Sequence, residues 1–323
     1  MKKAEAIHKM NQLGRERIPF LFVIDYEVKT PWIKPVSEIN REEVLYDING
    51  IANARSVSSP QKTLMFSAEP VLEEHYRKAF NLAQRHILHG NSFLLNLTFP
   101  SRIETNYTLK EIFYQSKARY KLWFRDQFVV FSPEIFIRTN GQKISSFPMK
   151  GTIDAQLPNA EKQLLTSQKE VAEHYTIVDL IRNDLSMIAK KVRVARFQYL
   201  ERIKTNQKEL LQMSSEVTGE LPENYHEHLG DIFFAMLPAG SISGAPKAKT
   251  LEVIRKAEQY DRGYFTGIFG IFDGKNLDSG VMIRFIEKTK EGLFYKSGGG
   301  ITSQSDCTEE YEELISKIYL PFS

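Results

Sequence analysis

One lysine and several paired glutamates are the side chains whose types and spacing suggest chemistry. Lys150 lies in the stretch Ser146-Phe147-Pro148-Met149-Lys150-Gly151-Thr152, which is typical of a strand end restrained by proline and turned by glycine. A lysine held at such a bend can act as a fixed cation, or as a nucleophile where its surroundings lower its pKa. On this segment alone a solvated loop charge is the commoner case, so other motifs must decide.

Two pairs of glutamates are each spaced one helical turn apart. Glu170 and Glu173 lie in a segment with helical periodicity, with His174 beside them and apolar side chains turned towards a core. Glu310 and Glu313 flank the apolar stripe of a helix expected near the end of the chain. Either pair alone is more often a solvated acidic face. Together, the two pairs could hold one Mg²⁺, which prefers oxygen ligands.

Two glycine-containing stretches could bring backbone groups close to a ligand. Residues 238–247 lead into a predicted helix, whose first N–H groups and dipole can bind an anion, although an ordinary tight turn explains the segment equally well. Ser297-Gly298-Gly299-Gly300-Ile301 follows the last predicted strand. Arg284, expected inside a strand, could bind a carboxylate through two hydrogen bonds, and an arginine on the wet face of a sheet is the alternative.

Composition and charge exclude several classes of protein. The 323 residues are 42% hydrophobic and 26% charged, and a formal net charge of +3 favours a small anionic ligand over nucleic acid. No run of residues approaches membrane-spanning length, and the charged N-terminal segment does not resemble a signal peptide. The single cysteine, Cys307, excludes an internal disulfide and suits a reducing cytoplasm. We therefore expect a cytoplasmic protein that binds neither nucleic acid nor membranes.

The order of predicted elements indicates an α+β fold in one compact domain spanning residues 1–323. A helix over the first 20 residues leads to a buried strand at 19–25. Helices are then expected at 69–89, 109–116, 160–189, 225–237, 246–257 and 308–319, and strands at 93–99, 120–137, 143–147, 264–272, 280–287 and 293–297. The strands before and after Asn140-Gly141 should pair as a hairpin.

The order of these motifs resembles that of the chorismate-utilising enzymes. The similarity runs from about Phe93 to the C-terminus, and residues 1–92 resemble the same fold more weakly. The matching segments are Ser132-Pro133-Glu134, 148–152, the Glu173-His174 helix that ends in Arg182-Asn183-Asp184, 240–247, Arg262-Gly263, and 298–301 with the acidic helix after it. The resemblance implies large antiparallel β-sheets flanked by helices around a central active site.

The family's aminodeoxychorismate-forming branch is the most similar, which implies a Mg²⁺-dependent reaction of chorismate with ammonia on the route to para-aminobenzoate and folate. The resemblance assigns the metal to Glu173 and Glu313, with Glu170 and Glu310 as outer or water-mediated ligands. Glu134 would be the general acid that protonates the departing C4 hydroxyl, which requires a carboxyl kept protonated by its surroundings.

The resemblance also implies a covalent role for Lys150, which would add to C2 of the ring as the C4 hydroxyl leaves, before ammonia attacks C4. Anthranilate-forming relatives carry alanine at this position. His174 would assist or only position other groups, and Arg284 would bind the enolpyruvyl carboxylate. The remaining substrate contacts would come from Gly151, Thr152, Ser243, Gly244, Gly298, Gly300 and Lys317.

Two positions depart from the family's pattern. Leu94 stands where the isochorismate- and salicylate-forming relatives carry a water-activating lysine, which argues against those activities. Phe265 stands where family members often carry a tyrosine, and a phenylalanine cannot supply the hydrogen bond that a tyrosine would offer to substrate. The family normally takes its ammonia from a separate glutamine amidotransferase subunit, and Cys307 does not lie in a glycine-flanked nucleophile elbow. We therefore expect such a partner. Anthranilate synthase component I and a non-catalytic subunit that docks a glutaminase are the alternative interpretations.

Overall fold

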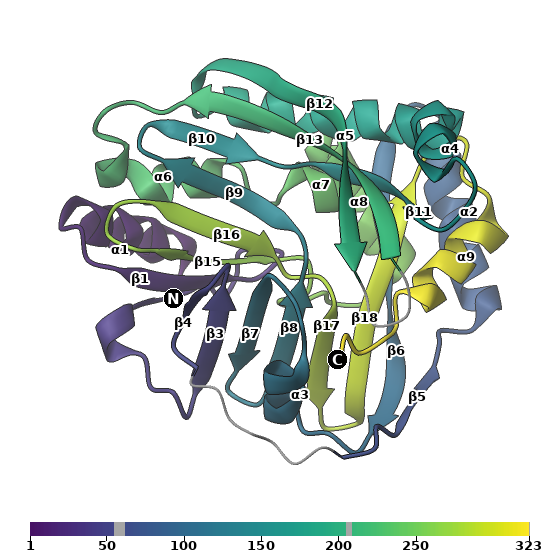
Figure 1. Cartoon of the computed structure of the whole chain (residues 1–323), viewed down its shortest axis with the longest axis horizontal. Helices are drawn as coiled ribbons and strands as arrows, with labels where there is room; N and C mark the ends of the chain where they lie inside the picture. The colour runs from purple at the N-terminus through teal and green to yellow at the C-terminus, as the bar shows by residue number, and fades with distance from the viewer. Residues whose placement is uncertain (55–61, 205–208, 323) are drawn as a thin grey trace. The chain divides into compact units, whose positions relative to one another are not determined.

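The computed structural model describes residues 1–54, 62–204 and 209–322, which form two compact units. Unit 1 contains Met1–Ser37, Glu134–Ser241 and Gly267–Ser279, and unit 2 contains Glu38–Pro133, Ile242–Thr266 and Gly280–Ser323. Each unit is built around one large sheet (Figure 1). The combination of large antiparallel sheets with helices confirms the predicted α+β class, whereas the single domain stays a prediction.

The sheet of unit 1 has nine strands within the described part of the chain. In spatial order they are β11 (Met149–Asp154), β13 (Glu209–Glu220), β10 (Lys143–Ser146), β9 (Ile135–Asn140), β16 (Leu277–Val281), β15 (Ile268–Phe272), β1 (Phe20–Ile24) and β2 (Trp32–Pro35), and β12 (Lys190–Lys204) pairs with β13. All five residues of β1 are buried, as its unbroken apolar run predicts. This unit also contains α1 (Lys3–Arg15), α4 (Ala160–Thr166), α5 (Gln168–Ser186), η2 (Tyr225–His228) and α6 (Leu229–Ala235).

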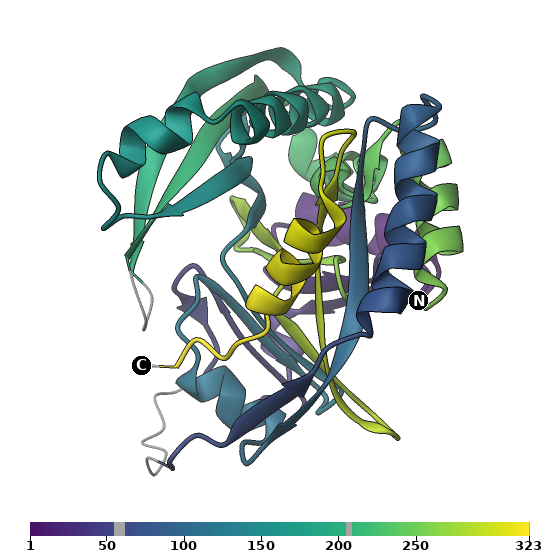
Figure 2. The same cartoon turned by 90° about the vertical axis from the view of Figure 1, so that its right-hand side faces the viewer.

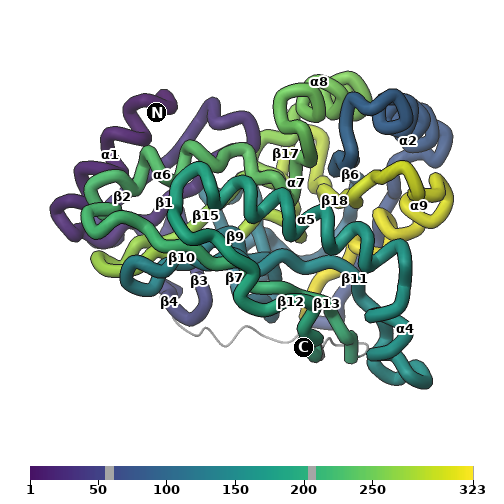
Figure 3. Tube along the Cα trace, turned by 90° about the horizontal axis from the view of Figure 1, so that it is seen from above, coloured from purple at the N-terminus to yellow at the C-terminus, as the bar shows by residue number. Residues whose placement is uncertain are grey.

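Helix α5 carries the first predicted acidic pair and is fixed at its start and along one face. The Ser167 side chain accepts a hydrogen bond from the backbone N–H of Glu170, as an N-cap does. The helix packs on β11, β12 and β13 (Figure 3). Its buried apolar side chains are Ile177, Val178, Ile181 and Leu185. Because these side chains face the sheet, the positions of the glutamates on the helix are set by the packing of its apolar face.

The sheet of unit 2 also has nine strands among the described residues. In spatial order they are β14 (Gly244–Ala245), β6 (Leu94–Thr105), β18 (Gly292–Ile301), β17 (Phe285–Thr289), β8 (Phe128–Ser132), β7 (Tyr120–Phe124), β3 (Val44–Ile48) and β4 (Ile51–Ala52), and β5 (Phe66–Glu69) pairs with β6. The helices of this unit are α2 (Glu73–Leu88), α3 (Leu109–Gln115), α8 (Lys247–Glu258) and α9 (Cys307–Ser316).

Helices α2, α8 and α9 of unit 2 share one hydrophobic core with β6 and β18. Helix α2 lies beside α8, and α9 packs along β18 (Figures 2 and 3). Leu314 of α9 is fully buried in this core, and Asp306 caps the helix by accepting hydrogen bonds from two backbone N–H groups. Tyr311 and Ile315 of the same helix pack against this core, so the apolar stripe predicted for the helix is found over the residues that the helix contains.

Several predicted element boundaries are wrong. Residues 190–204 and 209–220, for which no strand was predicted, form the long strands β12 and β13, which pair antiparallel. The strand predicted at 280–287 is interrupted, because β16 ends at Val281 in one sheet and β17 begins at Phe285 in the other. The run at 120–137 is likewise divided into β7, β8 and β9. A continuous apolar run shows that backbone is extended, but it does not show where the chain leaves one sheet for another.

Two glycine-containing segments also differ from expectation. Residues 297–301 continue strand β18 and do not follow it. Residues 240–245 form the short helix α7 (Gly240–Ser243) and β14, and Pro246 is the N-cap of α8 rather than a residue of its first turn. Among the described residues, no helix is long and apolar enough to cross a membrane.

Candidate active site

Lys150 lies in an irregular part of β11, where the pairing with β13 shifts register between Met149 and Thr152. Gly151 has a φ of +81° there, a conformation that glycine adopts without steric cost. The Lys150 Nζ lies 2.6 Å from Oε2 of Glu173 on α5, and the two side chains are 23% and 6% exposed. The lysine therefore pairs with a buried predicted metal ligand.

Glu170, one turn before Glu173, lies against the same irregular stretch of β11. A Cβ added to Gly151 would come within 3.0 Å of Oε2 of Glu170, so glycine leaves room for this carboxylate. Lys150, Gly151, Glu170 and Glu173 thus form one group, which we call the α5 cluster. Thr152 follows the cluster on β11 with an exposed side chain.

His174 lies within the core of unit 1 and makes its polar contact with a serine of β13. Its side chain is fully buried, and its Nε2 lies 2.6 Å from the hydroxyl oxygen of Ser215. Burial lowers the pKa of His174 to about 4, because desolvation disfavours the charged imidazolium. A neutral, buried ring at this place is consistent with positioning α5, the lesser of the two roles that the sequence left open.

Glu134 connects β8 to β9 and is half-buried. The hydroxyl of Ser241 donates a hydrogen bond of 3.2 Å to its Oε1. Glu134 thus presents a carboxyl group, oriented by a serine hydroxyl, of the type that can serve as a general acid.

The second acidic pair forms its own group in unit 2, which we call the α9 cluster. Glu310 is 2% exposed and accepts a hydrogen bond of 2.8 Å from the Ser305 hydroxyl. The Lys317 ammonium lies 2.7 Å from Oε1 of Glu313 and donates a hydrogen bond of 2.7 Å to the carbonyl of Gly298. The lysine thus links the acidic helix to the glycine stretch of β18.

Gly299 belongs to the α9 cluster, although the sequence pointed to Gly298 and Gly300. A Cβ at residue 299 would lie 3.2 Å from Oε2 of Glu310 and 3.8 Å from Oε1 of Glu313. A Cβ at Gly298 would instead clash with the backbone oxygen of Leu97 at 2.3 Å. Successive residues of a strand face opposite sides of the sheet. The sequence could therefore have indicated that Gly299 faces the other side from Gly298 and Gly300, if residues 298–300 had been predicted as part of a strand.

The predicted substrate contacts at 243–244 are tightly packed. Ser243 is fully buried, and Gly244 has a φ of +117° with its Cβ direction blocked at 1.9 Å by the carbonyl of Leu94. Glycine is therefore needed here for the close approach of β14 to β6, whatever its role towards substrate. The side chains of Leu94 and Phe265, the two departures from the family's pattern, are both buried.

Arg284 lies between β16 and β17 and not inside a strand, which corrects the expectation of a regular strand arginine. Its φ is +52°, an uncommon conformation for a residue with a side chain. Its Nε donates a hydrogen bond of 3.3 Å to the hydroxyl of Tyr319, and its guanidinium lies 5.4 Å from the centre of that ring. Backbone strain of this kind is often found at functional positions.

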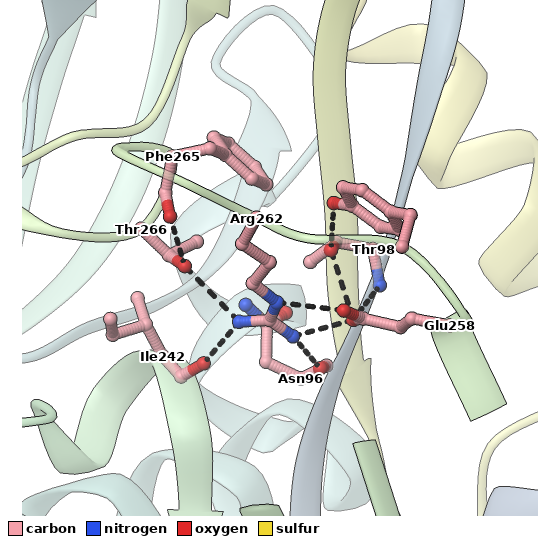
Figure 4. Close-up of polar contacts among 8 residues, drawn as sticks. Asn96, Thr98, Ile242, Glu258, Arg262, Phe265 and Thr266 are labelled. Atoms are coloured by element: carbon pink, nitrogen blue, oxygen red, sulfur yellow. Dashed lines mark hydrogen bonds and ion pairs between the residues drawn. The ribbon is translucent and has the colours of Figure 1, made fainter. Parts of the chain in front are cut away.

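A buried ion pair of unit 2, which sequence reasoning missed, organises the segments around the glycines (Figure 4). Arg262 Nη2 lies 2.5 Å from Oε1 of Glu258, and each side chain is only 1% exposed. The same carboxylate oxygen accepts a hydrogen bond of 2.8 Å from the backbone N–H of Thr98 on β6. The two residues are four apart in sequence, but Arg262 lies beyond the end of α8, so the helical spacing rule did not apply to them.

The Arg262 guanidinium also holds two backbone carbonyls. It donates to the carbonyl of Asn96 at 2.6 Å and to that of Ile242 at 3.1 Å (Figure 4). Asn96 and Thr98 lie opposite Gly300 and Gly298 in the β6–β18 ladder. The ion pair therefore anchors both the strand beside the glycines and the residue before Ser243.

We expect Glu258→Gln to lower the free energy of unfolding by about 3–5 kcal/mol, because the buried Arg262 charge would lose its counter-charge. Glu252→Gln, on the exposed side of the same helix, should leave the free energy of unfolding nearly unchanged, since it removes only surface ion pairs with Lys249 and Lys256. Urea unfolding of both variants measures the difference. Equal stabilities would contradict the anchoring role of Glu258.

The two acidic clusters contain donors that suit a magnesium ion. Both supply carboxylate oxygens, and in each a lysine ammonium already lies within 2.7 Å of one carboxylate. Within the described ranges, no group of three or more His, Cys, Asp or Glu side chains is arranged to hold a metal. Mg²⁺ is often bound by one or two carboxylates, with substrate and water completing its shell, so either pair fits this ion.

Comparison with known proteins supplies an independent view. The sequence pattern of the "chorismate binding enzyme" family matches residues 11–322. A PabA-like protein of Haemophilus influenzae, described as uncharacterized, is 51% identical over 315 residues, which cover 98% of this chain and 96% of that protein. Anthranilate synthase component 1 of Aquifex aeolicus is 32% identical over 76% of this chain and 51% of its own. Aminodeoxychorismate synthase component 1 of Bacillus subtilis is 31% identical over 78% of this chain and 56% of its own.

The same fold is found among solved structures. MenF, the menaquinone-specific isochorismate synthase of Escherichia coli, superimposes with a TM-score of 0.75 over 98% of this chain and 81% of its own, at 13% sequence identity. An identity this low shows a common fold and does not extend to the reaction.

Proposed function

The chain belongs to the chorismate binding enzymes, and from that membership we propose that it joins ammonia to chorismate, yielding 4-amino-4-deoxychorismate. The observation that carries the proposal is Lys150, whose amine lies 2.6 Å from Glu173 in an irregular stretch of strand. Anthranilate-forming relatives resemble this chain but carry alanine at the position, and an alanine cannot form a covalent adduct.

In the proposed mechanism, Lys150 Nζ bonds to C2 of the ring while Glu134 gives a proton to the C4 hydroxyl, which leaves as water. Ammonia then bonds to C4 and the bond between C2 and Nζ breaks, which places the amino group para. Lys150 must attack as a neutral amine, since an ammonium has no lone pair. Its ion pair with Glu173 therefore has to open, and the ammonium has to release one proton to solvent before the attack.

The proposal assigns Mg²⁺ to Glu173 and Glu313, with Glu170 and Glu310 as outer ligands. When bound, the ion would neutralise the ring carboxylate and act as a Lewis acid. Further substrate contacts are assigned to the following residues: Gly151, Thr152, Ser243, Gly244, Arg284, Gly298, Gly300 and Lys317. His174 is given a positioning role, which its burial and its contact with Ser215 support.

The source of ammonia is proposed to be a glutamine amidotransferase subunit. Relatives of both named activities are described as "component 1", which supports a second component for this chain as well. The proposal keeps the expected cytoplasmic location and a product destined for para-aminobenzoate and folate.

Anthranilate synthase component I is the second candidate, because identities of 32% and 31% to the two kinds of relative do not separate them. A non-catalytic subunit that docks a glutaminase is the third. The simultaneous presence of Glu134, Lys150, Glu173 and Glu313 favours catalysis over docking, because docking requires none of the four.

The deciding experiment incubates the full chain with chorismate, Mg²⁺ and an ammonium salt, without glutamine or any partner, and identifies the product by mass spectrometry. We expect 4-amino-4-deoxychorismate without release of pyruvate, because the proposed reaction replaces the C4 hydroxyl and keeps the enolpyruvyl group. Fluorescent anthranilate together with pyruvate would establish the second candidate. Unchanged chorismate would refute the assignment as an ammonia-using enzyme.

A further inference from the structure

Two buried hydroxyl groups of unit 2, those of Tyr76 on α2 and Ser297 on β18, have no hydrogen-bond partner among the residues that the structure describes. Tyr76 is fully buried, and Ser297 is 4% exposed. Most buried polar groups in proteins are hydrogen-bonded, because leaving one unsatisfied costs free energy. A buried hydroxyl without a partner in the protein therefore indicates that a bound molecule or ion supplies one.

The Ser297 side chain lies on the side of β18 that faces the α9 cluster. Alternate residues of a strand point to the same face, and the pairing of β18 with β6 is regular here, so Ser297 and Gly299 point the same way. A Cβ at Gly299 would lie 3.2 Å from Oε2 of Glu310 and 3.8 Å from Oε1 of Glu313. The Ser297 hydroxyl is therefore buried two residues along the strand from the point where the acidic pair meets it.

Tyr76 approaches the same place from α2, which packs beside α9 (Figure 1). Its ring makes an edge contact with that of Phe99 at a centroid distance of 5.7 Å, and Phe99 lies opposite Ser297 in the ladder of β6 and β18. The Tyr76 ring also lies 5.3 Å from that of Tyr311, the residue after Glu310 on α9. Tyr76 is thus in contact both with the strand pair that contains Ser297 and with the acidic helix.

The charges of the α9 helix act on the Tyr76 hydroxyl. Burial raises the pKa of Tyr76, and the negative charges of Glu310, Cys307 and Glu313 raise this pKa further. The hydroxyl therefore stays protonated and can both donate and accept a hydrogen bond. It lies near enough to the acidic pair to be affected by its charge, yet it forms no hydrogen bond with it. Its missing partner is therefore expected beside the acidic pair.

We propose that Tyr76 and Ser297 are positioning residues for the Mg²⁺ ion that the proposed function assigns in part to the α9 cluster, and that their hydroxyls bond to water molecules of its shell. The inference rests on that assignment and deepens it, because it adds two side chains that do not touch the ion. Mg²⁺ keeps several waters when carboxylates bind it. A metal-bound water donates strong hydrogen bonds, and a hydroxyl oxygen accepts them. A lone buried water is the alternative partner, and it would not depend on Mg²⁺.

Tyr76→Phe is the first test, because it removes the hydroxyl and keeps the ring. We expect the Mg²⁺ affinity, measured by calorimetry with chorismate present and ammonium absent, to fall on the order of 10-fold, as is usual when a partner of the metal's ligands is removed. Tyr311→Phe is the matched control. The Tyr311 ring packs against the same core, but its hydroxyl donates a hydrogen bond of 2.7 Å to the carbonyl of Val71. This control should bind Mg²⁺ as tightly as the natural chain.

Ser297→Ala is the second test, and it should lower the Mg²⁺ affinity in the same direction. Ser101→Ala is its matched control, because Ser101 is 1% exposed and its hydroxyl also has no partner in the described part of the chain. Ser101 lies on β6 opposite Tyr295, which is two residues farther from Gly299 than Ser297 is. Its removal should therefore leave the Mg²⁺ affinity unchanged.

Urea unfolding without metal distinguishes positioning from a structural role. In the metal-free chain, Tyr76→Phe and Ser297→Ala remove hydroxyls that have no partner, so the urea concentration at the midpoint should stay the same or rise. Tyr311→Phe should lower this midpoint, because the Val71 carbonyl loses its donor. Added Mg²⁺ should stabilise the natural chain more than the two test variants, since a ligand of the folded state stabilises it according to its affinity. Their turnover should return to the natural value at saturating Mg²⁺.

The outcomes separate this inference from the proposed function, because the affinity for Mg²⁺ is measured independently of the product. If the natural chain binds no Mg²⁺, the proposed metal assignment fails and takes the positioning role with it. If the natural chain binds Mg²⁺ and both test variants bind it as tightly as their controls, the inference is refuted while the function stands. A loss of affinity that accompanies an equal loss of metal-free stability also refutes it. A selective loss of affinity in Tyr76→Phe and Ser297→Ala supports it.

Discussion

Replacing Lys150 with alanine should reduce the formation of 4-amino-4-deoxychorismate by a factor on the order of 10³ or more. The expected loss is this large because the variant has no amine at C2, so the covalent route is closed rather than weakened. Chorismate binding should change much less, since the proposed carboxylate contacts of substrate come from other residues. Steady-state kinetics with ammonium as the amine donor measures both quantities.

Lys150→Arg distinguishes the two roles that a lysine can have at this place. Arginine keeps the positive charge beside Glu173 but cannot act as a nucleophile at neutral pH. If Lys150 forms a covalent bond, arginine should be as inactive as alanine, and mass spectrometry of the natural chain during turnover should detect an adduct on this lysine. Substantial activity of the arginine variant would show that Lys150 acts only as a cation.

Replacing Glu173 or Glu313 with glutamine should weaken Mg²⁺ binding, as measured by calorimetry in the presence of chorismate, by about 100-fold or more. Each change removes a formal charge and a strong oxygen donor from the proposed metal shell. Glu312→Gln is a matched control for the second variant, because it removes an exposed charge from the neighbouring position of α9. Its Mg²⁺ affinity should equal that of the natural chain.

The two metal-ligand variants should also behave alike in activity, with turnover partly restored at high Mg²⁺ concentration. If only one of them affects Mg²⁺ binding, the ion is held by a single acidic pair, and the assignment of both helices to one metal is wrong. Loss of activity without any change in Mg²⁺ affinity would assign the glutamates to substrate or structure instead.

Local patterns were sufficient to place most helices and the acidic pairs on them. The spacing of Glu170 and Glu173, and of Glu310 and Glu313, puts each pair on one side of its helix in the structure. The cap at Asp306 and the buried strand at 20–24 were also predictable, because both depend on a few neighbouring residues. The fold class and the family followed from the order of such local motifs along the chain.

The partners of these side chains could not be predicted, because they come from distant parts of the chain. Nothing near Lys150 in sequence indicates that it pairs with Glu173, or that Lys317 would link Glu313 to the carbonyl of Gly298. Arg284 was placed in a strand because its apolar neighbours continue on both sides. The chain in fact passes from one sheet to the other at this point, with a φ of +52°.

The amino-acid sequence by itself determined which chemical groups this protein has, the helical turn that separates the members of each acidic pair, and the family to which the chain belongs. Tertiary structure alone decided which lysine neutralises which carboxylate, which glycine faces an acidic helix, and that Arg262 and Glu258 are buried together. The physical reason is that backbone periodicity acts over a few residues, whereas burial and ion pairing depend on the packing of segments far apart in the chain.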